Sequence, residues 1–201
     1  MMKIKEKLNK QFQKPTGKLG RIVGLAMAIK NKDRANWTFK KLNFKPTDTI
    51  LEVGYGSGIV IKKIANKLTS GKIYGVDFSE IMFSQASKRN KKHIENKKVK
   101  LELGTIWEPS FSDSSFEIIF GSNVHFLWDN PNKELGKLKS LLKPKGRLIF
   151  VFQPRWAKNE TEIKEIAEKN KIEFEEIGLK NIEIEYKKMK PVTCIYISGQ
   201  K

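Results

Sequence analysis

The sequence predicts an α/β fold: a doubly wound, mostly parallel seven-stranded sheet with helices on both faces and an antiparallel C-terminal hairpin. Two observations support this prediction. From residue 47 onward, short strand-like runs alternate with longer segments of helical periodicity, an order that demands parallel strands joined by helical crossovers. The last two strand-like runs, within 181–199, are joined by a turn too short for a crossover, so one of them has to run antiparallel.

The chain of 201 residues is long enough for one ordinary domain with its own core. It contains no run of 18 apolar residues. The basic N-terminus "MMKIKEKLNKQFQK" lacks the apolar stretch of a secretory signal. Cys194 is the only cysteine, which excludes an internal disulfide and a cysteine metal cluster. We expect a cytoplasmic protein without a bound metal, with a peripheral position at the inner membrane face as the alternative.

Residues 1–45 differ from the rest of the chain and are treated as a separate N-terminal helical segment. Their apolar residues recur at helical spacing between positions 19 and 42, opposite a basic face. Pro46 ends the segment. We therefore expect one or two helices before the first strand, followed by the main domain at 46–201.

The first half of the main domain begins with a Pro-Thr-Asp turn that leads into a strand. The helix after it carries an apolar stripe, and Ser79 is placed to cap the second helix. The expected elements, in chain order, are a strand at 47–53, a helix at 58–69, a strand at 71–77, a helix at 79–93 and a strand at 98–104.

The second half begins after the turn-rich stretch "SFSDSS". We expect the next helix to stop before Pro144, and Gly178 to cap the last helix at its C-terminus. The expected elements are a strand at 115–122, a helix at 130–146, a strand at 146–153, a helix at 161–178 and two strands within 181–199.

Three glycines alternate in "LEVGYGSG", where the first strand gives way to its helix. Glycine permits positive φ and lets a ligand approach the backbone closely, and the helix start offers unpaired N–H groups. The spacing is Glu52-x-Gly-x-Gly-x-Gly, with the third glycine one residue too early for the dinucleotide fingerprint. The pattern favours an amino-acid-like tail and a sugar lying on the backbone over a diphosphate.

Asp77 ends the second strand, where an acid reaches a ribose diol. Two hydrogen bonds to its carboxylate would contribute about 1.5–3 kcal/mol each. Taken alone, Asp77 is equally compatible with a turn or helix cap. Together with the glycine loop, the ribose interpretation is favoured.

Three stretches at these intervals, "ILEVGYGSG", "IYGVDFS" and "LLKPKGRLIF", resemble the class I S-adenosylmethionine-dependent methyltransferases, above all the small single-domain type 11 group. The resemblance covers residues 46–152, whereas 160–201 match only in element order. It implies a Rossmann-like methyltransferase fold, the cofactor S-adenosyl-L-methionine and methylation of an acceptor. The stretch "FQKPTGKLGRIVGLAMAIKNKDRANW" is similar to an N-terminal extension of some small bacterial members.

The resemblance also implies roles for individual residues. The glycine loop would line the methionine moiety, Glu52 would anchor the loop or the amino group, and Asp77 would hold the ribose. The family often has Gly-Asp after the third strand, but this chain has Gly104-Thr105, so the adenine contact falls to Thr105 or to the backbone of Ile106. The expected cofactor residues are Glu52, Gly54, Tyr55 (protruding from the loop), Gly56, Ser57, Gly58, Asp77, Phe78 and Met82 (over the adenine faces), Thr105, Ile106 and Ser122 (beneath the sulfonium).

The stretch "SNVHFLWDNP" follows the fourth strand, where such enzymes meet their acceptor. We expect catalytic roles for Asn123, beside the sulfonium, and for His125, as a general base near neutral pH. The alternative for His125 is a structural residue beneath the loop. Phe126 and Trp128 are expected to form an aromatic wall for the substrate, and Trp37 to close the pocket; the alternative for all three is packing.

The absence of two sequence motifs narrows the range of possible methyl acceptors. Enzymes that methylate the amino group of a nucleobase usually carry an Asn/Asp-Pro-Pro-Tyr type motif after the fourth strand, and this chain lacks it there. Cytosine C5 methylation needs a nucleophilic cysteine at the same place, but Cys194 lies in the terminal hairpin. We expect a small-molecule or lipid acceptor, with the segment 1–45 as a lid or in contact with an anionic membrane.

The net charge of +18 leaves two alternatives: an RNA-directed enzyme with a Lys-rich binding surface, and a non-catalytic protein that binds S-adenosylmethionine. Only five of the 40 basic residues are arginine, which favours solvated charge over nucleic-acid binding. The sequence sets neither the acceptor's identity nor the oligomeric state.

Overall fold

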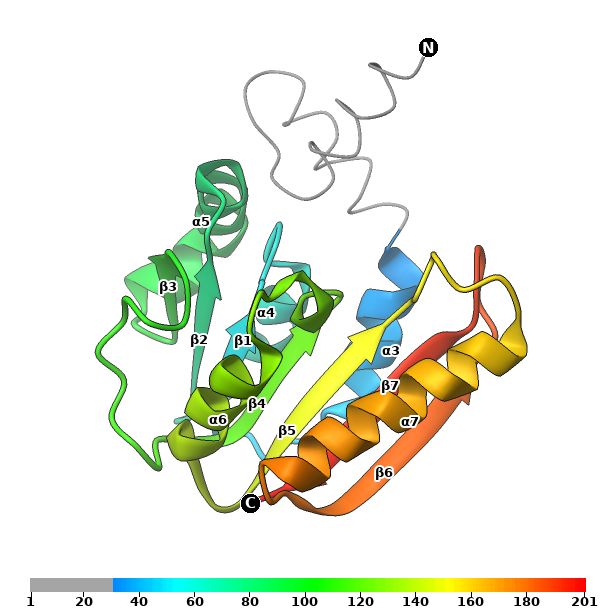
Figure 1. Cartoon of the computed structure of the whole chain (residues 1–201). Coiled ribbons are helices and arrows are strands. Elements are labelled where there is room, and N and C mark those ends of the chain that lie inside the picture. The colour runs from blue at the N-terminus through cyan, green and yellow to red at the C-terminus, as the bar shows by residue number, and fades with distance from the viewer. Residues whose placement is uncertain (1–30) are drawn as a thin grey trace.

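The computed structural model describes residues 31–201, which form one seven-stranded sheet with helices on both faces (Figure 1). The strand order is β3-β2-β1-β4-β5-β7-β6. Pairing is parallel from β3 to β5, while β7 runs antiparallel to both β5 and β6. The predicted fold class, with its terminal hairpin, is confirmed.

The elements follow the predicted alternation. In chain order they are α3 (Lys32–Lys41), β1 (Thr49–Val53), α4 (Ile59–Ala65), β2 (Lys72–Asp77), α5 (Glu80–Glu95), β3 (Val99–Leu103), β4 (Phe116–Ser122), the 3-10 turn η1 (His125–Leu127), α6 (Pro131–Leu141), β5 (Leu142–Phe152), α7 (Glu160–Glu176), β6 (Lys180–Lys187) and β7 (Cys194–Gln200).

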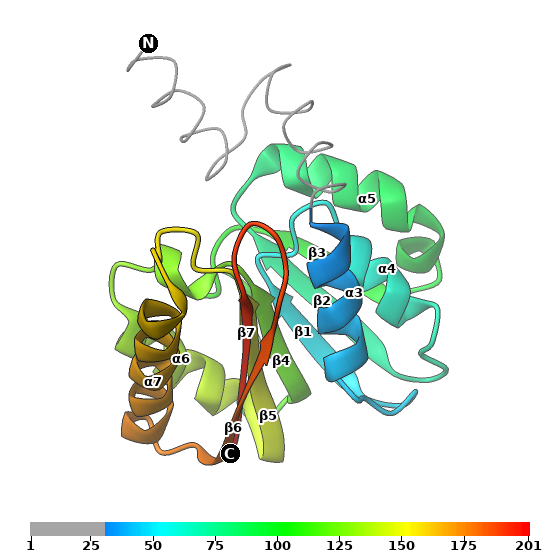
Figure 2. The ribbon, with the colours of Figure 1, turned by 90° about the vertical axis from the view of Figure 1, so that its right-hand side faces the viewer.

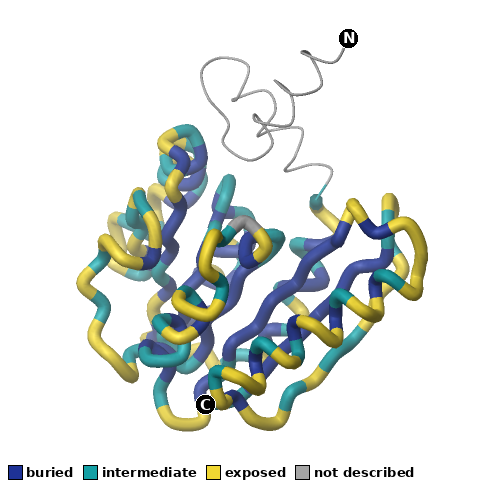
Figure 3. Tube along the Cα trace, viewed as in Figure 1, coloured by how far each residue is buried: buried dark blue, intermediate teal, exposed yellow. Residues whose placement is uncertain are grey.

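Two apolar layers separate the sheet from its helices. Figure 2 shows α3, α4 and α5 on one face of the sheet and α6 and α7 on the other. Alternate residues of β1 serve the two layers: Ile50 packs with α3 and α4, whereas Leu51 and Val53 pack with α6. The central strands are buried along most of their length (Figure 3), as expected of a parallel sheet covered on both faces.

Local signals place most element ends correctly. The Ser79 hydroxyl accepts a hydrogen bond from the Met82 amide at the start of α5, which confirms the predicted cap. Gly178 has φ +74° just after α7, in the left-handed conformation that glycine favours.

The predicted helix at 130–146 is too long. The helix α6 ends at Leu141, and Leu142 already pairs with Phe116 as the first residue of β5. The register then shifts before Ile118 pairs with Arg147, and Lys145 takes φ +64°. Pro144, which has no N–H, falls in this irregular stretch, so proline here marks a bulged strand entry and not only a helix end.

The helix α3 is the described part of the predicted segment 1–45, and it packs as a regular member of the main domain. Trp37 and Leu42 belong to the buried layer beneath it. Arg147 of β5 donates hydrogen bonds to the carbonyls of Leu42 and Asn43, which fixes the C-terminal end of α3. The periodic positions 19–27 lie outside the described residues, so their helix and their lid or membrane role stay predictions.

Within residues 31–201, no helix is both long and apolar enough to cross a membrane. The same residues hold no group of three or more His, Cys, Asp or Glu side chains that suits a metal ion. Cys194 is buried in β7 with a free thiol.

Candidate functional site

The glycine loop joins β1 to α4, and all three of its glycines have positive φ, between +51° and +71°. A Cβ atom on Gly54 would lie 2.9 Å from the Val124 side chain, and one on Gly58 would lie 2.7 Å from Asn90 Nδ2. A Cβ atom on Gly56 would meet nothing within 4 Å. Packing therefore requires Gly54 and Gly58 to be glycine, while Gly56 faces open space that a ligand can use.

The helix α5 holds this loop from outside. Arg89 Nε donates a 2.7 Å hydrogen bond to the carbonyl of Ser57, and Asn90 Nδ2 donates a 3.1 Å bond to the carbonyl of Gly58. The sequence analysis missed both residues, although Arg89 stands out as an arginine within a lysine-rich helix. Because both loop carbonyls are engaged, the loop is preorganised without a ligand.

Asp77 connects the end of β2 to the glycine loop. One carboxylate oxygen accepts from the Gly56 amide at 2.8 Å, and the other accepts from the Ser79 amide at 2.9 Å. Burial raises the pKa of Asp77, and these two amide bonds oppose the rise. Each oxygen keeps a further lone pair, so the carboxylate can accept two more hydrogen bonds from a diol at the face of Gly56.

Glu52 lies beneath the loop and is almost fully buried. Burial raises its pKa well above the ordinary value, and the nearby charge of Asp77 raises it further. Its Oε2 atom has no hydrogen-bond partner among the described residues. A buried carboxyl oxygen without a partner, beside the open glycine loop, suits a hydrogen-bond donor such as a ligand's amino group.

Tyr55 does not protrude from the loop, contrary to the sequence-based expectation. Its ring belongs to the layer under α4, and its hydroxyl donates to the carbonyl of Glu102 on β3. Burial raises the pKa of this phenol above its ordinary range. Tyr55 therefore supports the loop from within, and its side chain is not presented to a ligand.

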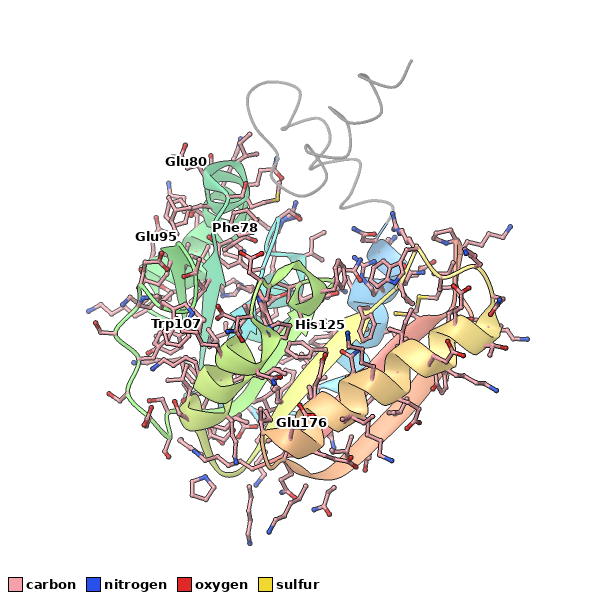
Figure 4. The ribbon with its side chains drawn as sticks, in the orientation of Figure 1. Phe78, Glu80, Glu95, Trp107, His125 and Glu176 are labelled. Carbon is pink, nitrogen blue, oxygen red and sulfur yellow. The ribbon has the colours of Figure 1, made fainter. Side chains whose placement is uncertain are left out.

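The expected adenine residues have different surroundings. Phe78, labelled in Figure 4, follows Asp77 directly and exposes 41% of its surface. Met82 and Ile106 are buried. Thr105 donates both its amide and its hydroxyl proton to Glu108, so its hydroxyl proton is not free for an adenine contact.

Residues after β4 and β5 form the neighbouring part of the site. The Ser122 hydroxyl accepts a 3.1 Å hydrogen bond from Arg34 of α3. Asn123 has φ +57°, and its side-chain oxygen accepts from the Gln153 amide at 2.9 Å. Asn123 therefore ties the ends of β4 and β5 together, which is a structural task beside its expected catalytic one.

His125 lies in an aromatic cage on the α7 side of the sheet and is 8% exposed. Its ring stacks on Phe150 at 4.8 Å and meets Phe152 edge-on at 4.3 Å. Burial lowers its pKa to about 3, and its Nδ1 atom has no hydrogen-bond partner in the part of the chain that the structure describes. A neutral imidazole in this cage is a poor base at neutral pH, which disfavours the expected role of His125 and favours the structural alternative.

The aromatic residues divide into packed and exposed ones. Trp37 packs against Tyr196, and half-buried Trp128 packs against Phe150, so both favour the packing alternative. Phe126 is exposed and meets the exposed Trp156 at 5.0 Å. The exposed aromatic pair next to this site is Phe126 with Trp156, a residue that the sequence analysis missed.

Comparisons with known proteins agree on one family. A family model described as a methyltransferase domain matches residues 50–146. A Bacillus subtilis protein described as an uncharacterized methyltransferase, YdaC, is 28% identical over 181 residues, which span 90% of this chain and 98% of that protein. The demethylmenaquinone methyltransferase of Lactobacillus johnsonii is 29% identical over 112 residues, 55% of this chain but only 46% of its own length.

The fold itself has solved counterparts. The crystal structure of a SAM-dependent methyltransferase from Aquifex aeolicus is similar with a TM-score of 0.66 and 19% identity. The match covers 90% of this chain and 97% of that one.

Proposed function

From these likenesses we propose that this chain is a class I S-adenosylmethionine-dependent methyltransferase and that it methylates a small organic acceptor bound at the carboxyl ends of β4 and β5. The family's cofactor is S-adenosyl-L-methionine. One observation carries the placement of this cofactor. The Gly56 amide donates to the Asp77 carboxylate, and a Cβ atom on Gly56 would meet nothing within 4 Å, so open space lies beside that carboxylate.

The residues at the glycine loop fit this cofactor. We assign the loop to its methionine tail, the Asp77 carboxylate to its ribose hydroxyls, and the exposed ring of Phe78 to one face of its adenine. We assign Glu52 to the amino group, because a cation bound beside this buried carboxyl would favour its ionised form against the raised pKa. When bound, S-adenosylmethionine supplies a methyl group already activated on a sulfonium sulfur.

The protein's contribution is then to orient the acceptor and exclude water. In the described residues after β4 and β5, the one imidazole is that of His125, which is buried and neutral. We propose that the accepting atom arrives with a free lone pair or as an anion, so that no side chain has to remove a proton.

A small-molecule or lipid acceptor is favoured over RNA for two reasons. The curated relative from Lactobacillus johnsonii is named for a quinone-type substrate, demethylmenaquinone. The exposed aromatic pair Phe126 and Trp156 has the apolar character of a pocket wall for such a molecule. The cytoplasmic setting and the lid or membrane role of the segment 1–45 stay predictions.

The test is a labelling experiment. The protein is incubated with methyl-labelled S-adenosylmethionine and separate small-metabolite, lipid and RNA fractions from a bacterial extract, with Asp77→Ala as the inactive control. We expect label in the small-metabolite or lipid fraction, dependent on intact Asp77. Label in RNA alone supports the RNA-directed alternative, and cofactor binding with no labelled fraction supports the non-catalytic one.

A further inference from the structure

Arg34, in the first turn of α3, is buried beside the proposed acceptor site, with only 6% of its surface exposed. Its Nε donates to Ser122 Oγ and its Nη1 donates to Gln153 Oε1, both at 3.1 Å. Figure 1 shows the start of α3 next to the end of β5, where these partners lie. Both partners are neutral, so neither balances the guanidinium charge.

No acidic residue among positions 31–201 forms an ion pair with Arg34. Glu6 is the single acid in the rest of the sequence. A buried cation is costly unless an anion pairs with it. Burial accordingly lowers the pKa of Arg34 to about 10, still far above neutrality, so it keeps its charge.

A second arginine increases the positive charge. Arg155 follows β5, and its charge lies close enough to lower the pKa of Arg34 further. Its Nη2 donates to Asn31 Oδ1 at 3.3 Å, again a neutral partner. Neither arginine forms an ion pair within residues 31–201, so these two like charges at one strand end form a site of positive potential.

Hydrogen bonds on its far side hold Gln153 in place. Its Nε2 donates to the carbonyls of Val192 and Lys190, at 2.8 and 3.3 Å, so its oxygen faces Arg34. The backbone amide of Gln153 donates to Asn123 Oδ1. The guanidinium is therefore held between two fixed acceptors, and its other N–H groups have no acceptor within residues 31–201.

We propose that the methyl acceptor carries an anionic group, a carboxylate or a phosphate, that binds to Arg34 with support from Arg155. The exposed rings of Phe126 and Trp156 cover the apolar body of the same molecule. This inference rests on the proposed function and specifies its substrate class. Guanidinium groups match the geometry of both anions because they donate two parallel hydrogen bonds.

The test uses three probes of similar shape: benzoate, phenyl phosphate and neutral benzamide. Binding to the full chain, saturated with S-adenosylhomocysteine, is followed by calorimetry. At least one anion is expected to bind about tenfold or more tightly than benzamide. The better of benzoate and phenyl phosphate identifies the anion type.

Three variants give the test its contrast. Arg34→Gln and Arg155→Gln should lose the preference for the anion, whereas Arg147→Gln, which removes the same charge at the other end of α3, should keep it. S-adenosylhomocysteine affinity within about twofold of wild type shows that each variant is folded. The exposed position of Arg155 makes its variant the safer one for folding.

Two results would overturn the inference: wild-type protein that binds benzamide as well as either anion, or an anion preference that survives in both Arg34→Gln and Arg155→Gln. Because no methyl transfer is measured, either result leaves the proposed methyltransferase function standing. That function fails separately, in the labelling experiment.

Discussion

The cofactor half and the acceptor half of the sheet's carboxyl edge are assembled from different distances along the chain. In the cofactor half, the Gly56–Asp77 and Ser57–Arg89 bonds join residues 21 and 32 positions apart. In the acceptor half, Arg34 reaches Ser122 and Gln153 across 88 and 119 positions. A site built locally leaves a motif in the sequence, whereas a site built from distant segments leaves isolated residues that only the fold brings together.

The largest effect is expected for Asp77→Ala in the cofactor half. The variant loses two charge-assisted hydrogen bonds to the ribose and the support of the Gly56 amide, so affinity for S-adenosylmethionine should fall about a hundredfold or more. Calorimetric titration measures the loss. Asp113→Ala, at an exposed turn, is the matched control and should bind like wild type. Unchanged affinity in Asp77→Ala would remove the assigned ribose site.

Two glycines of the same loop should respond differently to alanine. Gly58→Ala adds a clash with Ala86 and Asn90 to the backbone strain, and should lose about 2–4 kcal/mol of unfolding free energy. Gly56→Ala carries the strain alone, about 1–2 kcal/mol, but its methyl group enters the cradle. Chemical denaturation and cofactor titration together should show stability lost mainly at Gly58 and binding lost mainly at Gly56. Equal losses of stability and of cofactor affinity in the two variants would contradict the assignment of the open side of Gly56 to the cofactor.

In the acceptor half, Gln153→Leu should separate the two regions. The substitution removes the Gln153 hydrogen bonds to the carbonyls of Val192 and Lys190 and the bond from Arg34 Nη1, at a cost of about 1–3 kcal/mol in unfolding free energy. S-adenosylmethionine affinity should stay within about twofold of wild type. A large loss of cofactor affinity would show that the two halves do not act independently.

The smallest effect on activity is expected for His125→Phe, because the phenyl ring keeps the stacking on Phe150 and no base is lost. The effect on stability depends on pH. The folded-state pKa of about 3 lies below the ordinary value near 6.5, so below pH 6.5 the unfolded chain takes up a proton that the folded chain does not. Wild-type stability should therefore fall relative to His125→Phe by about 1.4 kcal/mol for each pH unit below that value.

Urea denaturation of both proteins between pH 5 and 8 measures their difference in unfolding free energy. This difference should no longer change with pH above about pH 7. A His125→Phe variant that keeps its fold and cofactor affinity but loses all methyl transfer would restore the catalytic interpretation of His125.

Element order, the terminal hairpin, the Ser79 cap and the glycine loop follow from the sequence because each depends on neighbours along the chain. The predicted end of the helix at 130–146 was wrong because the pairing of Leu142 with Phe116, a tertiary contact, decides where β5 begins. A related reason applies to Tyr55, which is buried where it was expected to protrude, and to His125, whose catalytic role stays a prediction. Both residue types suit a surface site or a core, and the packing of distant elements determines which one they occupy.

No sequence motif marks the acceptor-side residues Arg34, Arg155 and Trp156. Arg34 stands ahead of the first strand, in a helix that the sequence analysis assigned to a separate segment. Its role depends on α3 packing against β5, which brings its side chain to Ser122 and Gln153. The one signal in the sequence is that arginine is rare among the basic residues of this chain, so each arginine stands out.

The central claim is that the glycine loop with Asp77 binds S-adenosylmethionine and not a dinucleotide. Calorimetric titration of the wild-type chain with S-adenosylmethionine and, separately, with NAD tests it most directly. The account predicts saturable binding of S-adenosylmethionine and no heat of binding with NAD. Tight uptake of NAD with no response to S-adenosylmethionine would contradict it.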